Sequence, residues 1–237
     1  MFYLFHHMPK CGGTSFRAFL QSVFTIRNDY SGTDPQADPA RFSEFAGAPL
    51  DLSRMTARDC IVGHYNIKGI RLHERYPDLK HRTHKKFSIL RDPLEAARSG
   101  IRYNIQRGLL SDAMPEKERH ALLMRRASYF AHSFGVTSEA DLPGLFDRYW
   151  FIAPLDRMDH AMRIIEARIG RSGKAPPRLN TTTARDDALP DDVVAEFRER
   201  AHLDYQIYDL ARLRFGRIAA RVLDDKPAKA PGAEGVA

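Results

Sequence analysis

The chain has 237 residues, of which 43% are hydrophobic, and its formal net charge at pH 7 is +7. These values suit one domain with a substantial core, and the charge suits anionic ligands without choosing among nucleotides, sulfated sugars and nucleic acids. There is no long apolar run of about eighteen residues and no basic flank before the short apolar N-terminus, which predicts a cytoplasmic protein without membrane span or signal peptide. Cys11 and Cys60 lack metal-ligand or redox spacing, so we expect two reduced thiols.

The first predicted element is a buried strand over residues 2–8, an apolar run rich in aromatic side chains. Apolar residues at helical spacing return just beyond it, which predicts a helix. The loop between them reads Pro9-Lys10-Cys11-Gly12-Gly13-Thr14-Ser15. Its glycines let backbone N–H groups approach an anion, its hydroxyls and its lysine add donors, and the helix N-terminus adds a favourable dipole. The pattern therefore predicts a site for a phosphate-like group, with a plain glycine turn and a solvated lysine as the structural alternative.

The position of Lys10 argues against an ordinary ATP or GTP loop, because G-x-x-x-x-G-K-[ST] places the lysine after the second glycine and Lys10 precedes both. The order Pro-Lys-x-Gly-Gly-Thr-Ser resembles the 5′-phosphosulfate loop of sulfotransferases that use 3′-phosphoadenosine 5′-phosphosulfate (PAPS). The likeness is strongest to the carbohydrate branch, which includes heparan sulfate 2-O-sulfotransferases. Cys11 stands where that family commonly has Thr or Ala. The resemblance implies an α/β fold, a P-loop-like parallel sheet flanked by helices, and binding of PAPS by Lys10, Cys11, Gly12, Gly13, Thr14 and Ser15.

A short apolar strand over residues 59–63 leads directly into His64. In a parallel sheet the carboxyl ends of the strands face the ligand crevice, so His64 is expected beside the phosphate loop. The segment resembles the family's Gly-His motif, in which the histidine is the general base. An imidazole that titrates near neutral pH suits removal of a proton from a hydroxyl, although a histidine that only caps the strand end remains the structural alternative.

The next strand signal, residues 87–90, runs into Arg91-Asp92-Pro93, with Asp92 as expected N-cap and Pro93 at the first helical position. Arg91 followed by Ser99 resembles the family's 3′-phosphate-binding pair, and a guanidinium suits a dianion through paired charge-assisted hydrogen bonds. Ala96 departs from the family, which often has arginine there. Arg98 and Arg102 are the nearest compensating candidates on the same predicted helix. The structural alternative pairs Arg91 with a nearby carboxylate.

The remaining chain is predicted to be mainly helical. Residues 103–148 read as an amphipathic layer with basic residues that either form a solvated face or contact an acceptor. A further strand is expected over residues 149–155, then a helix that ends at Gly170, and one closing helix over residues 190–215. Asn180 and Thr182 lie in a segment that resembles a family loop near the nucleotide, which makes them further cofactor-binding candidates. The sulfotransferase domain is assigned to residues 1–223, and the composition of residues 224–237 predicts a disordered tail.

Together these motifs imply transfer of a sulfuryl group from PAPS to an acceptor hydroxyl, with a saccharide favoured by the resemblance and nucleic acid not expected. His64 is predicted to remove the proton and Lys10 to stabilise the leaving group. No metal is expected, because a sulfuryl group carries less charge than a phosphoryl group. Two alternatives stay open. One is a P-loop kinase or NTPase with Asp92 as its metal-binding acid, and the other is a non-catalytic module that binds anionic polymers.

Overall fold

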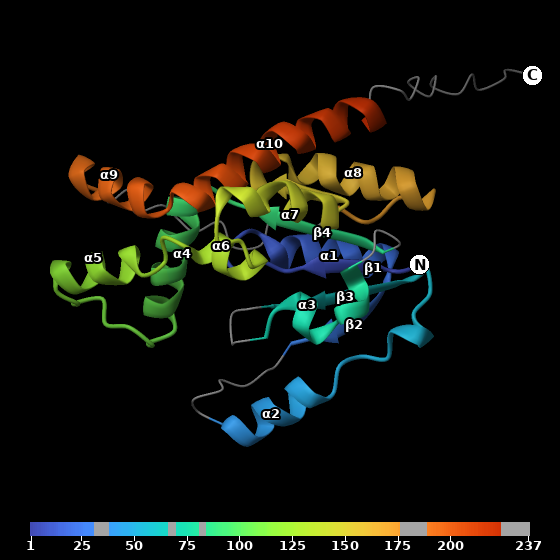
Figure 1. The fold of residues 1–237 in the computed structure, drawn as a ribbon, viewed down its shortest axis with the longest axis horizontal. Coiled ribbons are helices and arrows are strands. Elements are labelled where there is room, and N and C mark those ends of the chain that lie inside the picture. Colours follow the sequence, from blue (N-terminus) through green and yellow to red (C-terminus); the bar gives the residue numbers. More distant parts are fainter. Residues whose placement is uncertain (31–37, 66–69, 81–83, 176–188, 224–237) are drawn as a thin grey trace, which may run out of the picture.

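A computed structural model of the chain describes residues 1–30, 38–65, 70–80, 84–175 and 189–223. These residues form a five-stranded parallel sheet in the order β2-β3-β1-β4-β5, flanked by helices (Figure 1). The strands are β1 (Tyr3–His6), β2 (Thr25–Asp29), β3 (Asp59–Gly63), β4 (Lys85–Leu90) and β5 (Phe151–Pro154). The predicted α/β class and parallel sheet are confirmed.

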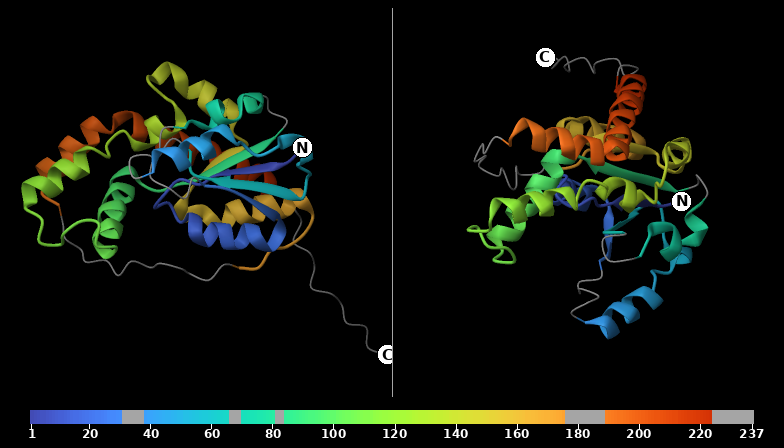
Figure 2. Two further views of the ribbon diagram at one scale, coloured as in Figure 1. Left: turned by 90° about the horizontal axis from the view of Figure 1, so that it is seen from below. Right: turned by 60° about the vertical axis from the view of Figure 1, so that its left-hand side comes forward.

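Alternation along the first strand sends side chains to two different layers. Tyr3 and Phe5 pack with α1 (Gly13–Val23), α8 (Met158–Ile169) and the C-terminal half of α10 (His202–Leu223) on one face. Phe2 and Leu4 pack on the opposite face, against the region of α3 (Leu72–Arg75). Figure 2 shows α1 and α8 together below the sheet and α3 above it. The sheet is therefore covered on both sides, as a parallel sheet of largely apolar strands requires.

A helical extension projects beyond the sheet (Figure 1). It consists of α4 (Pro93–Gln106), α5 (Glu116–Met124) and α9 (Asp191–Arg200), which share a core of their own. Next to it, α6 (Tyr129–Phe134) and α7 (Leu142–Arg148) pack against the first half of α10. The Asp204 carboxylate of α10 accepts hydrogen bonds from the backbone N–H groups of Phe130 (2.9 Å) and Ala131 (2.8 Å) and so caps α6. The mixed helical region predicted over residues 103–148 is thus a packed layer.

Two elements differ from the sequence-based expectation. The edge strand β2 went unpredicted because Ile26 is its one large apolar residue, and edge position leaves most of its side chains in solvent. The single closing helix is in fact two, α9 and α10, separated at Ala201. The break has a physical reason. Phe197 of α9 packs against α4 and α5, whereas Ile207 of α10 packs toward the sheet, and one straight helix could not place both side chains in these two separate cores. The helix end at Gly170 agrees with prediction, and a further short helix, α2 (Pro39–Gly47), follows β2.

Part of the sequence-based hypothesis falls outside the described residues. This holds for Asn180 and Thr182, and for the predicted tail over residues 224–237. Of the helices that the structure describes, none is long and apolar enough to cross a membrane.

Candidate functional site at the carboxyl ends of the strands

The strand order brings three predicted site segments to one edge of the sheet. β1 lies between β3 and β4, and His6 is in register with both Gly63 and Ser88. The loop after β1, His64 after β3 and Arg91 after β4 therefore leave the sheet side by side. From β1 the chain first forms β2 and β3 on one side of the sheet and then β4 and β5 on the other. The carboxyl end of β1 is therefore the topological switch point, where ligands bind in open α/β sheets.

The glycine loop has a backbone conformation suited to an anion. Lys10 and Gly12 both adopt left-handed geometry, with φ of 64° and 75°, and α1 begins immediately afterwards at Gly13. The N-cap residue of α1 is Gly12, which has no side chain, so that residue offers no capping oxygen to the N–H groups of the first turn. A Cβ on Gly12 would also lie 2.3 Å from Leu155 Cδ1. The positive φ favours glycine at position 12, whereas the space requires only that the end of the Leu155 side chain move. A glycine turn that leads directly into a helix N-terminus suits a phosphate group.

Lys10 is surrounded by other positive groups and an aromatic ring. Its ammonium lies 3.8 Å from the centroid of the Tyr103 ring on α4. Burial lowers the pKa of Lys10, the Tyr103 hydroxyl opposes this, and the nearby guanidinium groups of Arg91 and Arg126 lower it further. Lys10, Arg91 and Arg126 are thus close enough to interact electrostatically, and an anion would relieve their repulsion.

His64 forms a cluster with two residues that the motifs did not single out. His64 Nε2 lies 3.2 Å from His7 Nδ1, which in turn lies 2.7 Å from the Tyr30 hydroxyl. Burial, followed by the proximity of His64 and Arg17, lowers the pKa of His7 to about 3. His7 is therefore neutral near pH 7.

His7 also connects this cluster to the glycine loop. A Cβ placed on Gly13 would lie 1.9 Å from His7 Nε2, so the imidazole ring lies directly against the first residue of α1. The second glycine of the loop thus makes room for His7. Through this contact the proposed base and the phosphate cradle are neighbours.

A buried ion pair holds Tyr30 in place. Asp29, which precedes Tyr30 at the end of β2, is 2% exposed and accepts hydrogen bonds from Arg75 Nε (2.8 Å) and Nη2 (2.7 Å). The hydroxyl groups of Tyr65 (3.0 Å) and Tyr76 (2.8 Å) donate to the same carboxylate. Four donors on one carboxylate satisfy its buried lone pairs and fix the end of the edge strand beside the site.

Arg91 is engaged by a carboxylate on its own helix. Arg91 Nη2 lies 3.1 Å from Glu95 Oε2, Arg98 Nη1 lies 3.0 Å from Glu95 Oε1, and Arg102 Nη2 is 3.9 Å from Glu95 Oε2. The Arg91 and Glu95 side chains are 28% and 36% exposed, so this pair is weak, about 0–1 kcal/mol, and a phosphate dianion can compete with it. Ser99 is buried in the middle of α4.

Asp92 acts as the predicted helix cap. Its carboxylate accepts a hydrogen bond of 3.1 Å from the backbone N–H of Glu95, and Pro93 begins α4. Among the described residues there is no group of three or more His, Cys, Asp or Glu side chains arranged to hold a metal ion. Cys11 is a buried free thiol whose pKa is raised to about 12 by burial. Cys11 therefore serves packing of the loop and is not an activated nucleophile.

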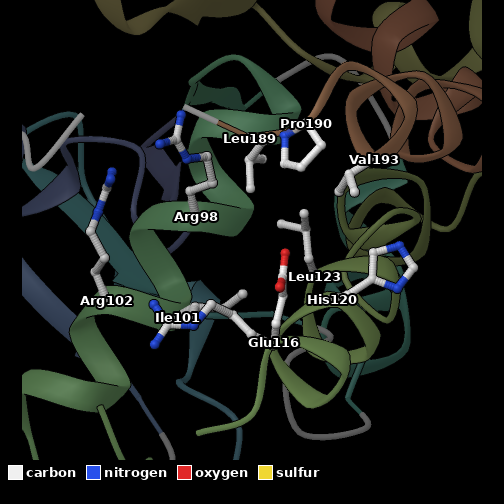
Figure 3. A pocket seen from close by; sticks show the side chains of 10 residues that line it. Arg98, Ile101, Arg102, Glu116, His120, Leu123, Leu189, Pro190 and Val193 are labelled. Atoms are coloured by element: carbon white, nitrogen blue, oxygen red, sulfur yellow. The ribbon is translucent and has the colours of Figure 1, made fainter. Parts of the chain in front are cut away.

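A cavity of about 300 Å³ lies one helix away from the strand ends, between α4, α5 and the start of α9 (Figure 3). The walls of this cavity are apolar and include Ile101, Leu123, Leu189 and Val193. Its rim is charged and includes Arg98, Arg102, Arg119 and Glu116. Of the described residues, none that was predicted to bind the donor lines the cavity.

Sequence reasoning missed His7, Tyr30 and Arg126. The His-His pair directly before the loop was a usable signal for His7, because the residue after a parallel strand faces the ligand edge. Tyr30 follows the unpredicted strand β2, and Arg126 lies in the helical layer, where its basic neighbours concealed it.

Comparison with known proteins supports the fold. No family model and no curated protein matches the sequence. A solved sulfotransferase from Alicyclobacillus acidocaldarius is similar with a TM-score of 0.50 and 15% identity, over 88% of this chain and 94% of that one. The mouse sulfotransferase SULT7A1, solved with PAP, aligns with a TM-score of 0.44 and 17% identity over 84% of this chain, which spans 64% of the mouse protein. The chain therefore has the α/β fold found in the bacterial sulfotransferase.

Proposed function

We propose that this protein transfers a sulfuryl group from PAPS to a hydroxyl group of a saccharide. The observation that carries the proposal is the meeting of three features at one sheet edge. These are a glycine loop with Lys10, a histidine cluster that contains His64, and Arg91 at the end of β4.

The donor is divided between two sets of groups. The N–H groups of Gly12 to Ser15, together with Lys10, bind the 5′-phosphosulfate, since they combine a helix N-terminus with a mobile positive charge. Arg91 and Ser99 bind the 3′-phosphate. Arg91 then exchanges its exposed contact with Glu95 for a stronger bidentate contact with the dianion. Asn180 and Thr182 are proposed as further donor ligands on the strength of the motif alone.

The reaction is an in-line displacement at sulfur. The acceptor oxygen attacks the sulfur atom, His64 takes the hydroxyl proton, and the bond from sulfur to the 5′-phosphate oxygen breaks. Lys10 and the first-turn N–H groups stabilise the charge that grows on the departing phosphate. His7 stays neutral and holds the His64 ring by the 3.2 Å contact, so it is a positioning residue.

The saccharide acceptor rests on the resemblance of the loop to the carbohydrate branch. Arg98, Arg102 and Arg119 at the rim of the cavity between α4 and α5 suit an acidic sugar, but the apolar walls of that cavity do not themselves select one. Of the alternatives, the kinase or NTPase loses support because Asp92 is used as a helix cap and Lys10 precedes the glycines.

Calorimetry separates the classes. Adenosine 3′,5′-bisphosphate should bind without a metal and more tightly than ATP with Mg²⁺, whereas the reverse order would favour an NTPase. His64→Ala should abolish sulfuryl transfer while bisphosphate affinity stays within about threefold, and an equal loss of both would show a structural histidine. His160, which lies on α8 with its side chain 37% exposed beside Asp159, provides the matched control, His160→Ala, which should keep both properties.

A second pair of variants tests the 3′-phosphate contact. Arg91→Ala should weaken binding of the bisphosphate far more than binding of AMP, by about tenfold or more for a lost charge-assisted contact. Glu95→Gln removes the competing carboxylate and should leave bisphosphate affinity equal or higher. If Arg91→Ala leaves the ratio of the two affinities unchanged, Arg91 is not the 3′-phosphate ligand.

A further inference from the structure

Arg126 is a partly buried cation without an acidic partner in the part of the chain that the structure describes. It follows the exposed Arg125 in the turn between α5 and α6. No carboxylate of the described residues forms an ion pair with it, unlike Arg91, Arg98 and Arg102, which share Glu95. Burial lowers its pKa from the usual arginine value. A guanidinium removed from water without a counter-charge is costly, so the position calls for a ligand.

The guanidinium of Arg126 lies on the small-residue face of α4. A Cβ on Gly100 would lie 2.5 Å from Arg126 Nη1 and 2.9 Å from its Cζ. Ala96, Ala97 and Gly100 occupy one face of the helix, because residues three and four apart are neighbours. Their small side chains leave the space that the guanidinium fills.

The same guanidinium is close to the phosphate loop. Pro9, Lys10, Ala96 and Arg126 line one small recess between the loop and α4. Asp204 lines it too, but both oxygens of its carboxylate accept hydrogen bonds from backbone N–H groups of α6, and it forms no ion pair with Arg126 among the described residues. Arg126 also acts electrostatically on Lys10, as does Arg91. Three cations thus surround the space between the loop and the beginning of α4, and Glu95 contacts Arg91 at its edge.

Placement on α4 indicates which part of the donor Arg126 would bind. Ser99, the residue assigned with Arg91 to the 3′-phosphate, lies three residues after Ala96 and is therefore its neighbour on α4. Ala96, where an arginine was expected, belongs to the face that Arg126 covers. Arg98 and Arg102 share Glu95 with Arg91, but unlike Arg91 they line the separate cavity in Figure 3. They are therefore poor substitutes for the missing arginine.

We propose that Arg126, from a different helix, supplies the arginine that position 96 lacks and binds the 3′-phosphate of the donor together with Arg91 and Ser99. This assignment rests on the proposed function. The planar fork of a guanidinium donates two parallel hydrogen bonds to a phosphate, so Arg126 would select the bisphosphate nucleotide over nucleotides with a 5′-phosphate only.

The test compares nucleotides that differ in one phosphate. Affinities of adenosine 3′,5′-bisphosphate, adenosine 3′-monophosphate and AMP are measured by calorimetry on the unaltered protein and on Arg126→Ala. In Arg126→Ala the affinity for the two 3′-phosphorylated nucleotides should fall about 10- to 100-fold, and the affinity for AMP should fall by less than about threefold. The matched control is Arg125→Ala, which removes the same charge from the exposed neighbouring residue and should change no affinity by more than about twofold.

Gly100→Ala tests the same contact without removing a charge. The added methyl group must displace the guanidinium, because 2.5 Å is far inside contact distance. Alanine is favoured over glycine in a helix interior, so the thermal midpoint should be kept while 3′-phosphate discrimination falls. This variant decides the question if Arg126→Ala folds poorly.

Two results would overturn the assignment. Suppose that the unaltered protein binds the bisphosphate more tightly than AMP. If the ratio of these two affinities is then unchanged in both Arg126→Ala and Gly100→Ala, Arg126 is not part of the site. A loss for the bisphosphate and for AMP, with adenosine 3′-monophosphate unchanged, would place Arg126 on the 5′ side instead. If the unaltered protein binds the bisphosphate no better than AMP, the proposed function itself fails, and the role of Arg126 fails with it.

Discussion

Gly13→Ala tests the contact that joins the histidine cluster to the glycine loop. The new Cβ would lie 1.9 Å from His7 Nε2 and 2.0 Å from its Cδ2, whereas ordinary carbon contacts are about 3.5–4 Å. His7 must therefore move by well over 1 Å, but its Nδ1 is held by Tyr30 at 2.7 Å and His64 at 3.2 Å. Moving the ring breaks both contacts, and the variant should lose its ordered His64 together with stability.

The cost follows from these contacts. Both contacts converge on Nδ1 of His7, which has a single proton or a single lone pair, so together they count as about one hydrogen bond of about 1 kcal/mol; overpacking adds about 1–3 kcal/mol. The gain from replacing glycine in a helix, up to about 1 kcal/mol, opposes it. We expect a net loss of about 1–3 kcal/mol in the free energy of unfolding, measured in urea by the fluorescence of Trp150, the one tryptophan of the chain.

A double-mutant cycle with His7→Ala isolates the contact. Removing the ring makes room for the methyl group, so the double variant should be more stable than the sum of the single effects, by about 1–3 kcal/mol. Gly47→Ala is the control, since a Cβ there meets nothing within 4 Å. Strict additivity, or a Gly13→Ala variant as stable as the unaltered protein, would refute the placement of His7 against the loop.

Two further predictions concern stability around the site. Arg75→Met should lower the free energy of unfolding by about 3–5 kcal/mol, because it leaves the buried Asp29 carboxylate without its counter-charge. Arg27→Met is the control: the Arg27 side chain is 49% exposed, so the loss should be about 0–1 kcal/mol. Equal urea midpoints for the two variants would contradict this. His6 is 1% exposed and burial lowers its pKa to about 3 from 6.5, so only the unfolded chain takes up its proton between these values. The contribution of neutral His6 to stability should therefore be fully present above pH 6.5 and fall as the pH drops toward 3. In His6→Gln the urea midpoint should decline less steeply between pH 7 and 4 than in the unaltered protein. Equal slopes would exclude His6 as a cause of the decline.

The sequence by itself determined the features whose causes are local. A strand, two glycines and a helix start are encoded in consecutive residues, and the left-handed φ of Gly12 and the cap of α4 by Asp92 confirm that reading. Parallel strands and their carboxyl-end residues were predictable for the same reason, since each apolar run carries its own pattern.

Tertiary structure decided which side chains meet. His7, His64 and Tyr30 belong to three segments, and the insertion of β3 between β1 and β2 brings them together. Arg126 reaches α4 only because the helices pack with Gly100 at the contact. Such contacts depend on strand order and packing across long stretches of chain, which the periodicity of a single segment does not encode.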